Sequence, residues 1–291
     1  NTVDGVREIY EDTVTNTLYY LGQIQMDIAQ PYRFCSYHEG VWSISEAYDM
    51  PTESAVRYGD TLVIGGHFTY IDTVPFPHIA AYVDDQIIPF GNFSDAVFGL
   101  RVIDHTLYAV GAFVTVDGQL CRGVAKREAG AWTPVGDFPA HNGALTDIAM
   151  YQGNLVVTGT MSFLNLPFKH IIQYNGSEWL PLGPGIRTSM GGGGPLAVYR
   201  DELYVGGIFR LNEGNAGHAI MRWNGTVWNP VGTGVQDVTG GYQYGFAVND
   251  LRVKDNLLFA VGGFEYAGNA PAAFTATWDG DRWCGFGGAL D

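Results

Sequence analysis

Hydrophobic and polar positions follow one another along this chain in a unit of short segments that recurs. The clearest copy spans 202–232 and reads ELYVGGIFRLNEGNAGHAIMRWNGTVWNPVG. In it an apolar run ends in a Gly-Gly pair, a loop follows, a second run ends at Asn-Gly, and a third begins with Trp and closes on Val-Gly. Short apolar runs bounded by turn residues are typical of β-strands. The pattern therefore predicts a group of short strands joined by tight turns.

The same unit can be placed six times on one glycine, with a leucine four residues before it and a large apolar residue two residues after it. The anchor glycines are Gly22, Gly66, Gly111, Gly159, Gly207 and Gly262. Successive anchors lie 44 to 55 residues apart. Such a period, made of short strands, is the signature of a β-propeller blade.

Six blades of about 48 residues account for nearly all of the 291 residues. The sequence therefore predicts an all-β fold, a six-bladed β-propeller of four-stranded antiparallel blades, as a single domain over 1–291. We expect the ring to close by packing of the sixth blade on the first, with a shared closing strand from residues 1–5 as the alternative. The blades are expected at about 6–50, 51–94, 95–139, 140–190, 191–240 and 241–291.

Two kinds of segment vary most between the copies: the linkers that join the blades and the loops between second and third strands. Both are expected on one face of a propeller, opposite the short turns between strands. Loops held on a rigid scaffold are where function usually resides. We therefore expect a binding site on this face, over the central channel.

The longest linker, 233–248, concentrates aromatic side chains beside glycines. Its Tyr242, Tyr244 and Phe246 suit contact with a glycan or a protein. The alternative is that these rings cover the channel mouth or pack on the fifth blade. Four further residues are expected on the same face: Phe98, His141, Arg187 and Met190.

The formal net charge of −15 makes anionic binding partners unfavourable. An acidic surface repels phosphate backbones and anionic membrane surfaces, and the chain has no basic stripe. Nucleic-acid binding is therefore not expected. Membrane insertion is not expected either, because no run of 18 apolar residues occurs. The chain opens with Asn1 and shows no signal peptide, which we interpret as a mature or excised fragment.

The segments LYVGGIF (203–209) and AIMRWNGTVWNPVGTGV (219–235) resemble the repeat of large secreted bacterial surface proteins. That repeat is similar to kelch and galactose-oxidase-like propellers and to the propeller of the fungal cortical polarity marker. The resemblance covers essentially the whole chain and implies a propeller fold and an extracellular or cell-surface location. Many bacterial members carry a sorting domain for type IX secretion, so the resemblance implies that route by analogy. The copper ligands and the cross-linked Tyr–Cys pair of galactose oxidase have no recognisable counterpart motif here.

The residues that could bind a metal ion are better explained by structural roles. His78, His170 and His218 lie at the start of third strands in three blades, too far apart around a ring to share a metal. Acidic turns at 84–85 and 279–281 could hold calcium, but they lack the spaced ligands of a calcium loop, which favours turn chemistry. No cofactor is therefore expected, with calcium as the open alternative. All seven tryptophans fall in repeat positions, so we expect them to be wedges between blades.

The three cysteines leave two alternatives open. Cys35 falls in the first blade and Cys284 in the last, which are neighbours in a closed ring. A disulfide between them would leave Cys121 free, and the other alternative is three free thiols.

Motifs of catalysis do not occur: the chain has no H-E-x-x-H, no C-x-x-C and no G-x-S-x-G. We therefore expect a non-enzymatic extracellular or cell-surface interaction module that binds a surface protein or a glycan. One rival is a polysaccharide-active enzyme, a lyase or hydrolase, that uses carboxylates at the channel mouth with His141, Tyr242 and Tyr244. The other is an architectural domain of an adhesin or filament. Converging ionisable side chains with shifted pKa values would favour the enzyme.

Overall fold

The computed structural model describes residues 6–24, 32–83, 86–163, 169–189, 191–236 and 248–285. Regular structure in these ranges is β-strand, apart from one 3-10 helix of three residues, η1 (Leu211–Glu213). No helix in the described ranges has the length and apolar character needed to cross a membrane. The chain divides into two compact units, Asn1–Pro139 and Ala140–Asp291.

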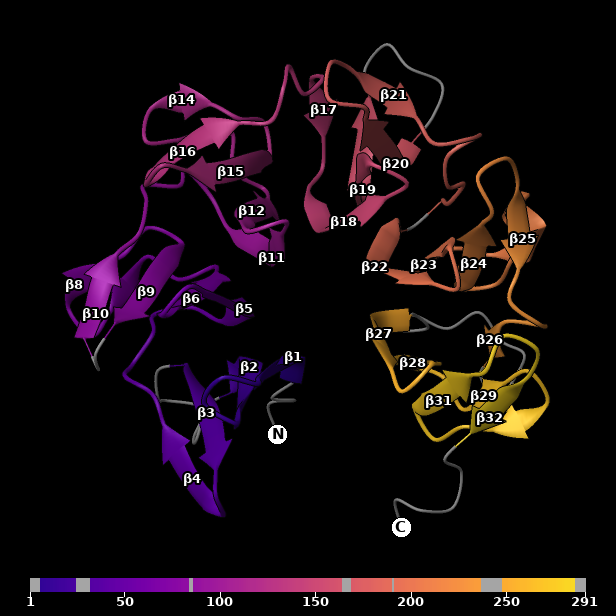
Figure 1. Cartoon of the computed structure of the whole chain (residues 1–291), viewed down its shortest axis with the longest axis horizontal. Coiled ribbons are helices and arrows are strands. Elements are labelled where there is room, and N and C mark those ends of the chain that lie inside the picture. The colour runs from indigo at the N-terminus through magenta and orange to yellow at the C-terminus, as the bar shows by residue number, and fades with distance from the viewer. Residues whose placement is uncertain are drawn as a thin grey trace. The chain divides into compact units, whose positions relative to one another are not determined.

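Unit 1 contains three four-stranded antiparallel sheets, each formed from contiguous sequence (Figure 1). The first comprises β1 (Val6–Asp12), β2 (Thr17–Ile24), β3 (Arg33–His38) and β4 (Val41–Ile44). The second comprises β5 (Thr52–Tyr58), β6 (Thr61–Gly66), β9 (Ile79–Val83) and β10 (Gln86–Pro89). The third comprises β11 (Val97–Ile103), β12 (Thr106–Gly111), β15 (Val124–Glu128) and β16 (Ala131–Pro134).

Unit 2 repeats this plan. Its first sheet comprises β17 (His141–Asn142), β18 (Leu145–Tyr151), β19 (Asn154–Phe163), β20 (Lys169–Tyr174) and β21 (Trp179–Pro181), because β17 adds a short fifth strand to the long β19. The second comprises β22 (Gly193–Tyr199), β23 (Glu202–Gly207), β24 (Ile220–Trp223) and β25 (Trp228–Pro230). The third comprises β27 (Val248–Lys254), β28 (Leu257–Gly262), β31 (Thr275–Trp278) and β32 (Trp283–Gly285).

Every predicted blade thus contains one antiparallel sheet with four consecutive main strands, and the expected boundary at 139/140 is also the boundary between the two units. The predicted all-β fold of four-stranded antiparallel propeller blades is confirmed. The closure of the six blades into a single ring, as one domain over 1–291, stays a prediction.

Three tiny hairpins were not predicted. They lie in the loops between second and third main strands: β7 (Tyr70–Ile71) with β8 (Val74–Pro75), β13 (Thr115–Val116) with β14 (Gln119–Leu120), and β29 (Tyr266–Ala267) with β30 (Ala270–Pro271). Linkers pair with these hairpins in both units, through the bridges Tyr48–Ile71 and Phe93–Val116 and through β26 (Val235–Gln236) on β29. The prediction that linkers and these loops emerge together is confirmed for these three sheets.

Trp132, at the start of the fourth main strand of its sheet, packs against the linker that follows the preceding sheet. Trp132 is almost fully buried, its indole N–H donates to the Phe90 carbonyl at 2.7 Å, and its ring meets Phe93 at 5.1 Å between centroids. Gly91, with a φ of +156°, allows this approach, because a Cβ there would lie 2.8 Å from the indole nitrogen. The wedge role predicted for the repeated tryptophans is confirmed at this position.

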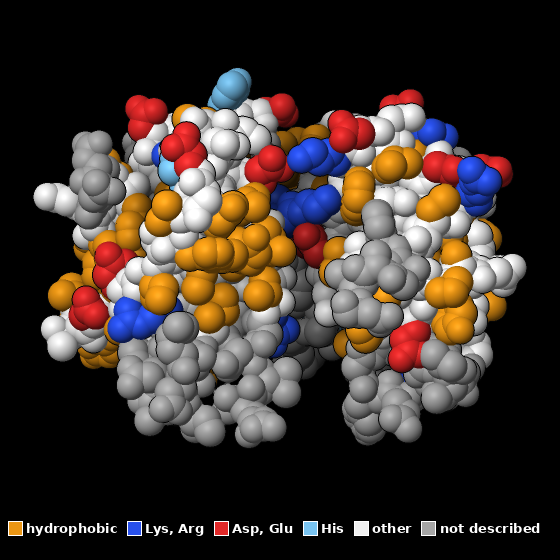
Figure 2. Space-filling model, turned by 90° about the horizontal axis from the view of Figure 1, so that it is seen from below, with side chains coloured by type: hydrophobic (Ala, Val, Ile, Leu, Met, Phe, Trp, Pro, Cys, Tyr) orange, Lys and Arg blue, Asp and Glu red, His pale blue; other side chains and the backbone are white. Residues whose placement is uncertain are grey.

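The first sheet of unit 1 differs from the sheet that contains Trp132, because it leaves several large apolar side chains exposed on the surface of the unit. Trp42 is 59% exposed and meets the rings of Tyr20 and Tyr37 at 5.1 and 5.0 Å. On the same edge strand, β4, Val41 and Ile44 are also exposed. Figure 2 shows hydrophobic side chains gathered on the part of the surface where this sheet lies.

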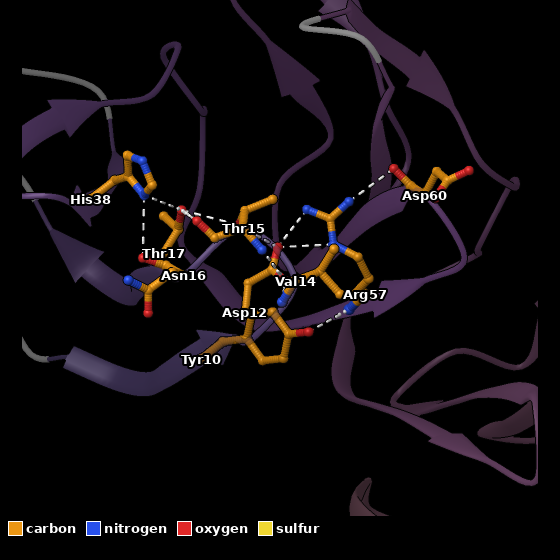
Figure 3. A network of polar contacts seen from close by, with 9 residues as sticks. All are labelled: Tyr10, Asp12, Val14, Thr15, Asn16, Thr17, His38, Arg57 and Asp60. Carbon is orange, nitrogen blue, oxygen red and sulfur yellow. Dashed lines mark hydrogen bonds and ion pairs between the residues drawn. The ribbon is translucent and has the colours of Figure 1, made fainter.

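A buried polar network holds the first two sheets of unit 1 together. Asp12, at the end of β1, has no exposed surface, and its Oδ2 accepts hydrogen bonds from the Arg57 Nε on β5 and from the Thr15 hydroxyl, both at 2.8 Å (Figure 3). The Tyr10 hydroxyl accepts the backbone N–H of Arg57 at 2.8 Å. Burial raises the pKa of the Asp12 carboxyl, but its bonds with Arg57, Thr15 and Val14 outweigh burial, so this pKa lies below that of an ordinary aspartic acid.

Candidate functional site

A β-bulge recurs near the start of the first main strand in each of the six larger sheets, on β1, β5, β11, β18, β22 and β27. Directly after the bulge, a polar side chain of one sheet accepts a backbone N–H of the next sheet. Glu8 accepts from Ala55 at 3.2 Å and Ser54 accepts from Leu100 at 3.1 Å in unit 1. In unit 2, Asp147 accepts from Leu196 at 2.9 Å. These bonds fix the linker end of the first strands, so side chains at the bulges themselves have defined positions.

The bulge residues differ between the two units. In unit 1 they are Arg7, Glu53 and Phe98, two charged residues and an aromatic one. In unit 2 the first and third sheets have Thr146 and Asn249, which carry no charge. Bulges often redirect side chains at functional sites. Charged and aromatic side chains therefore occupy the bulges of unit 1, at the strand ends that adjoin the linkers.

Glu53 forms a pair with His67, which directly follows the anchor glycine at the end of β6. The His67 Nε2 and a Glu53 carboxylate oxygen are 3.5 Å apart, with side chains 40% and 13% exposed respectively. The backbone N–H of His67 donates to the Pro51 carbonyl at 2.9 Å, which holds the residue against the linker. The ring of Phe98 lies 5.1 Å from the imidazole, at an interplanar angle of 56°.

Burial shifts the pKa values of this pair in opposite directions. It raises the pKa of Glu53, an effect that Arg7 partly offsets and Glu8 reinforces. It lowers the pKa of His67, against a smaller opposing effect of Asp95. Both shifts favour the neutral forms, a carboxylic acid that can donate a hydrogen bond and an imidazole that can accept one. We call Arg7, Glu53, His67 and Phe98 the bulge-end cluster.

His78 lies beside the bulge-end cluster. Burial lowers its pKa, and its Nδ1 is buried without a hydrogen-bond partner among the described residues. Its backbone has a left-handed φ of 68°, but His170, Ala219 and Phe274 have similar values at the equivalent place in other sheets. The unusual conformation therefore belongs to the repeat rather than to a site.

Of the seven predicted site residues, Phe98 is the one found in the bulge-end cluster. His141 is on β17 in unit 2, with its ring 6.0 Å from that of Phe163. Arg187, also in unit 2, has its backbone held by Asn215, whose Oδ1 accepts the Arg187 N–H at 2.9 Å. Four predicted residues lie outside the described ranges: Met190, Tyr242, Tyr244 and Phe246.

The residues weighed as metal ligands have structural contacts. His170 is buried, with its Nδ1 3.3 Å from the Gly159 carbonyl. Asp279 accepts the N–H groups of Asp281 and Arg282 at 2.9 Å, which is turn chemistry as expected. The other acidic turn, 84–85, lies outside the described ranges. Across those ranges no group of three or more His, Cys, Asp and Glu side chains is placed to hold a metal ion. Cys35, Cys121 and Cys284 are free thiols in the structure.

Glu53 and His67 were not among the predicted site residues. A signal was nevertheless present at His67, because the residue after the anchor glycine is not titratable in the other five copies of the repeat. Only the bulge, which adds one residue to the first strand, turns Glu53 toward His67.

No protein-family profile and no curated protein matches the chain. Among solved structures, the chain is similar to the extracellular domain of the one-component system protein BT4673 from B. thetaiotaomicron, with 10% identity over 91% of this chain and a TM-score of 0.49. It spans 38% of that longer chain. It is also similar to the β-propeller domain of the Trilobed protease from Pyrococcus furiosus, with 8% identity, 92% of this chain and 81% of that chain covered, and a TM-score of 0.48.

Proposed function

We propose that this protein is an extracellular or cell-surface binding module that recognises a carbohydrate at the bulge-end cluster of unit 1. The observation that carries the proposal is the Phe98 ring, partly exposed beside the Glu53–His67 pair. The C–H-rich face of a sugar packs on an aromatic ring, while its hydroxyls exchange hydrogen bonds with nearby polar groups.

The cluster has both parts of such a site. Phe98 supplies an apolar surface with a defined orientation, since the bulge on β11 and the buried Leu100 that follows it fix the backbone. Glu53 and His67 supply a carboxyl group and an imidazole that are already partly desolvated and can exchange hydrogen bonds with sugar hydroxyls. A preformed site of this kind needs little ordering when a ligand binds.

The proposal predicts that Phe98→Ala weakens carbohydrate binding by about tenfold or more, because truncating an aromatic anchor typically costs about 1–2 kcal/mol or more. A glycan array followed by calorimetric titration measures the change. The matched control is Phe274→Ala, since Phe274 is an exposed phenylalanine in unit 2. Binding that Phe98→Ala leaves unchanged, or an array with no bound carbohydrate, would contradict the proposal.

One observation favours the rival enzyme. A carboxyl group with a raised pKa beside an imidazole with a lowered one is an arrangement that general acid–base catalysis uses. The assay measures new reducing ends released from a bound polysaccharide. If wild-type protein releases them and Glu53→Gln binds the polysaccharide without releasing them, the protein is a polysaccharide-active enzyme and not a binding module.

A further inference from the structure

Arg7 is a cation at the bulge-end cluster that no acid of the described residues engages. It is the bulge residue of β1, it is exposed, and within the described ranges it forms no ion pair. Its neighbour Glu8 accepts the N–H of Ala55, two residues beyond Glu53, so Arg7 and Glu53 are bulge residues at the same end of neighbouring strands. The positive charge of Arg7 lowers the pKa of both Glu53 and His67. The chain has a net charge of −15, so an exposed arginine in this position contrasts with its acidic composition.

The neighbouring acids are occupied by other contacts. Glu8 is buried and divides its carboxylate between the Ala55 N–H at 3.2 Å and the Arg101 guanidinium at 3.4 Å. Asp95 accepts the N–H of Ala96 at 2.7 Å. Glu53 points to His67 instead, in a setting where burial disfavours its charge. The positive charge of Arg7 therefore remains available to a ligand.

We propose that the carbohydrate bound at the bulge-end cluster is an acidic one, a uronic-acid-type sugar whose carboxylate pairs with Arg7 while its ring packs on Phe98. This inference rests on the proposed function. Arginine suits the role because its planar guanidinium can hold a carboxylate through two parallel hydrogen bonds.

Such a site also depends on pH. The titratable and charged groups around the Glu53–His67 pair are Arg7 and Glu8 from β1, His78 before β9, and Asp95 from the linker before β11. Raising the pH ionises Glu53 and so adds a negative charge beside Arg7. Lowering the pH protonates the histidines and adds positive charge. Both changes make the affinity for an acidic sugar fall as the pH rises.

The test compares a uronic-acid tetrasaccharide with its carboxyl-reduced, neutral counterpart by calorimetric titration. Wild-type protein is expected to bind the acidic form at least tenfold more tightly at pH 5, with the preference shrinking toward pH 8. Arg7→Gln should bind both forms equally. Arg282→Gln, which changes an arginine with a 77% exposed side chain in unit 2, should keep the preference. Glu53→Gln should retain the preference with a weaker dependence on pH.

The outcomes separate the two proposals. Equal affinity of wild-type protein for the two tetrasaccharides, or a preference that survives in Arg7→Gln, overturns the assignment of an acidic ligand but leaves carbohydrate binding intact. A preference that shows the same pH dependence in Glu53→Gln overturns the role given to that carboxyl. If neither sugar binds, or if Phe98→Ala binds both as wild type does, the proposed function itself is wrong.

Discussion

Replacing Asp12 with alanine is expected to destabilise unit 1 by about 3–5 kcal/mol, the usual cost of breaking a buried ion pair by removing one partner. The change removes the carboxylate that pairs with Arg57 of the neighbouring sheet, and the Arg57 side chain is only 17% exposed (Figure 3). It also removes the acceptor of the Thr15 hydroxyl. Urea unfolding, followed by tryptophan fluorescence, measures the loss.

The control for Asp12 is Asp137→Ala in the same unit. Asp137 pairs with Arg122 at 2.9 Å, but its side chain is 97% exposed, and exposed pairs contribute about 1 kcal/mol or less. Equal effects of the two changes would show that the Asp12 network adds nothing beyond a surface pair.

The effect of Asp12 should also depend on pH in a definite direction. Its pKa is lower in the folded protein than the value of about 3.9 for an unfolded aspartic acid. The stabilisation is therefore fully present above that unfolded value and is lost as the pH falls through the folded one. The difference in unfolding free energy between wild-type protein and Asp12→Ala should accordingly be constant near neutral pH and shrink below about pH 4.

The second large effect is expected at Trp132, where alanine should cost about 3–5 kcal/mol. The side chain projects from β16 and is buried against the linker before β11. Its loss removes the ring contacts with Phe93 and Phe90 and the hydrogen bond to the Phe90 carbonyl. Because Gly91 has no side chain to fill the space, a cavity should remain. Thermal and urea unfolding both report the change.

Val114→Ala is the comparison for Trp132, since Val114 is an exposed apolar residue of the same sheet's loop. It should alter stability by less than about 0.5 kcal/mol. A cost below about 1 kcal/mol for Trp132→Ala would contradict the wedge role of the repeated tryptophans.

The strands could be predicted because their signals are local. A polar turn, an apolar run and an anchor glycine recur in each copy, and each copy forms one sheet. The hairpin β13–β14 was missed although Asp117-Gly118 is a hairpin turn, with φ values of 49° and 80°. Strands of two residues are too short to show an alternation of polar and apolar positions, so the loop pattern concealed them.

The site was only partly predictable. Phe98 was expected on the loop face because it lies in a variable linker, and it does lie at the linker end of β11. Glu53 and His67 come together through a bulge and through pairing of β5 with β6, and neither leaves a mark on the hydrophobic pattern. The raised pKa of Glu53 depends on burial, which follows from packing rather than from spacing.

The most direct test of carbohydrate recognition at the bulge-end cluster is histidine side-chain NMR during titration with the uronic-acid tetrasaccharide. The His67 ring touches both the Phe98 ring and the Glu53 carboxyl, whereas His141 and His170 lie in unit 2. We expect the His67 resonances to shift in a saturable way while those of His141 and His170 stay in place. Saturable shifts confined to His141 or His170, or unchanged His67 resonances at saturating sugar, would contradict the assignment of the binding site to unit 1.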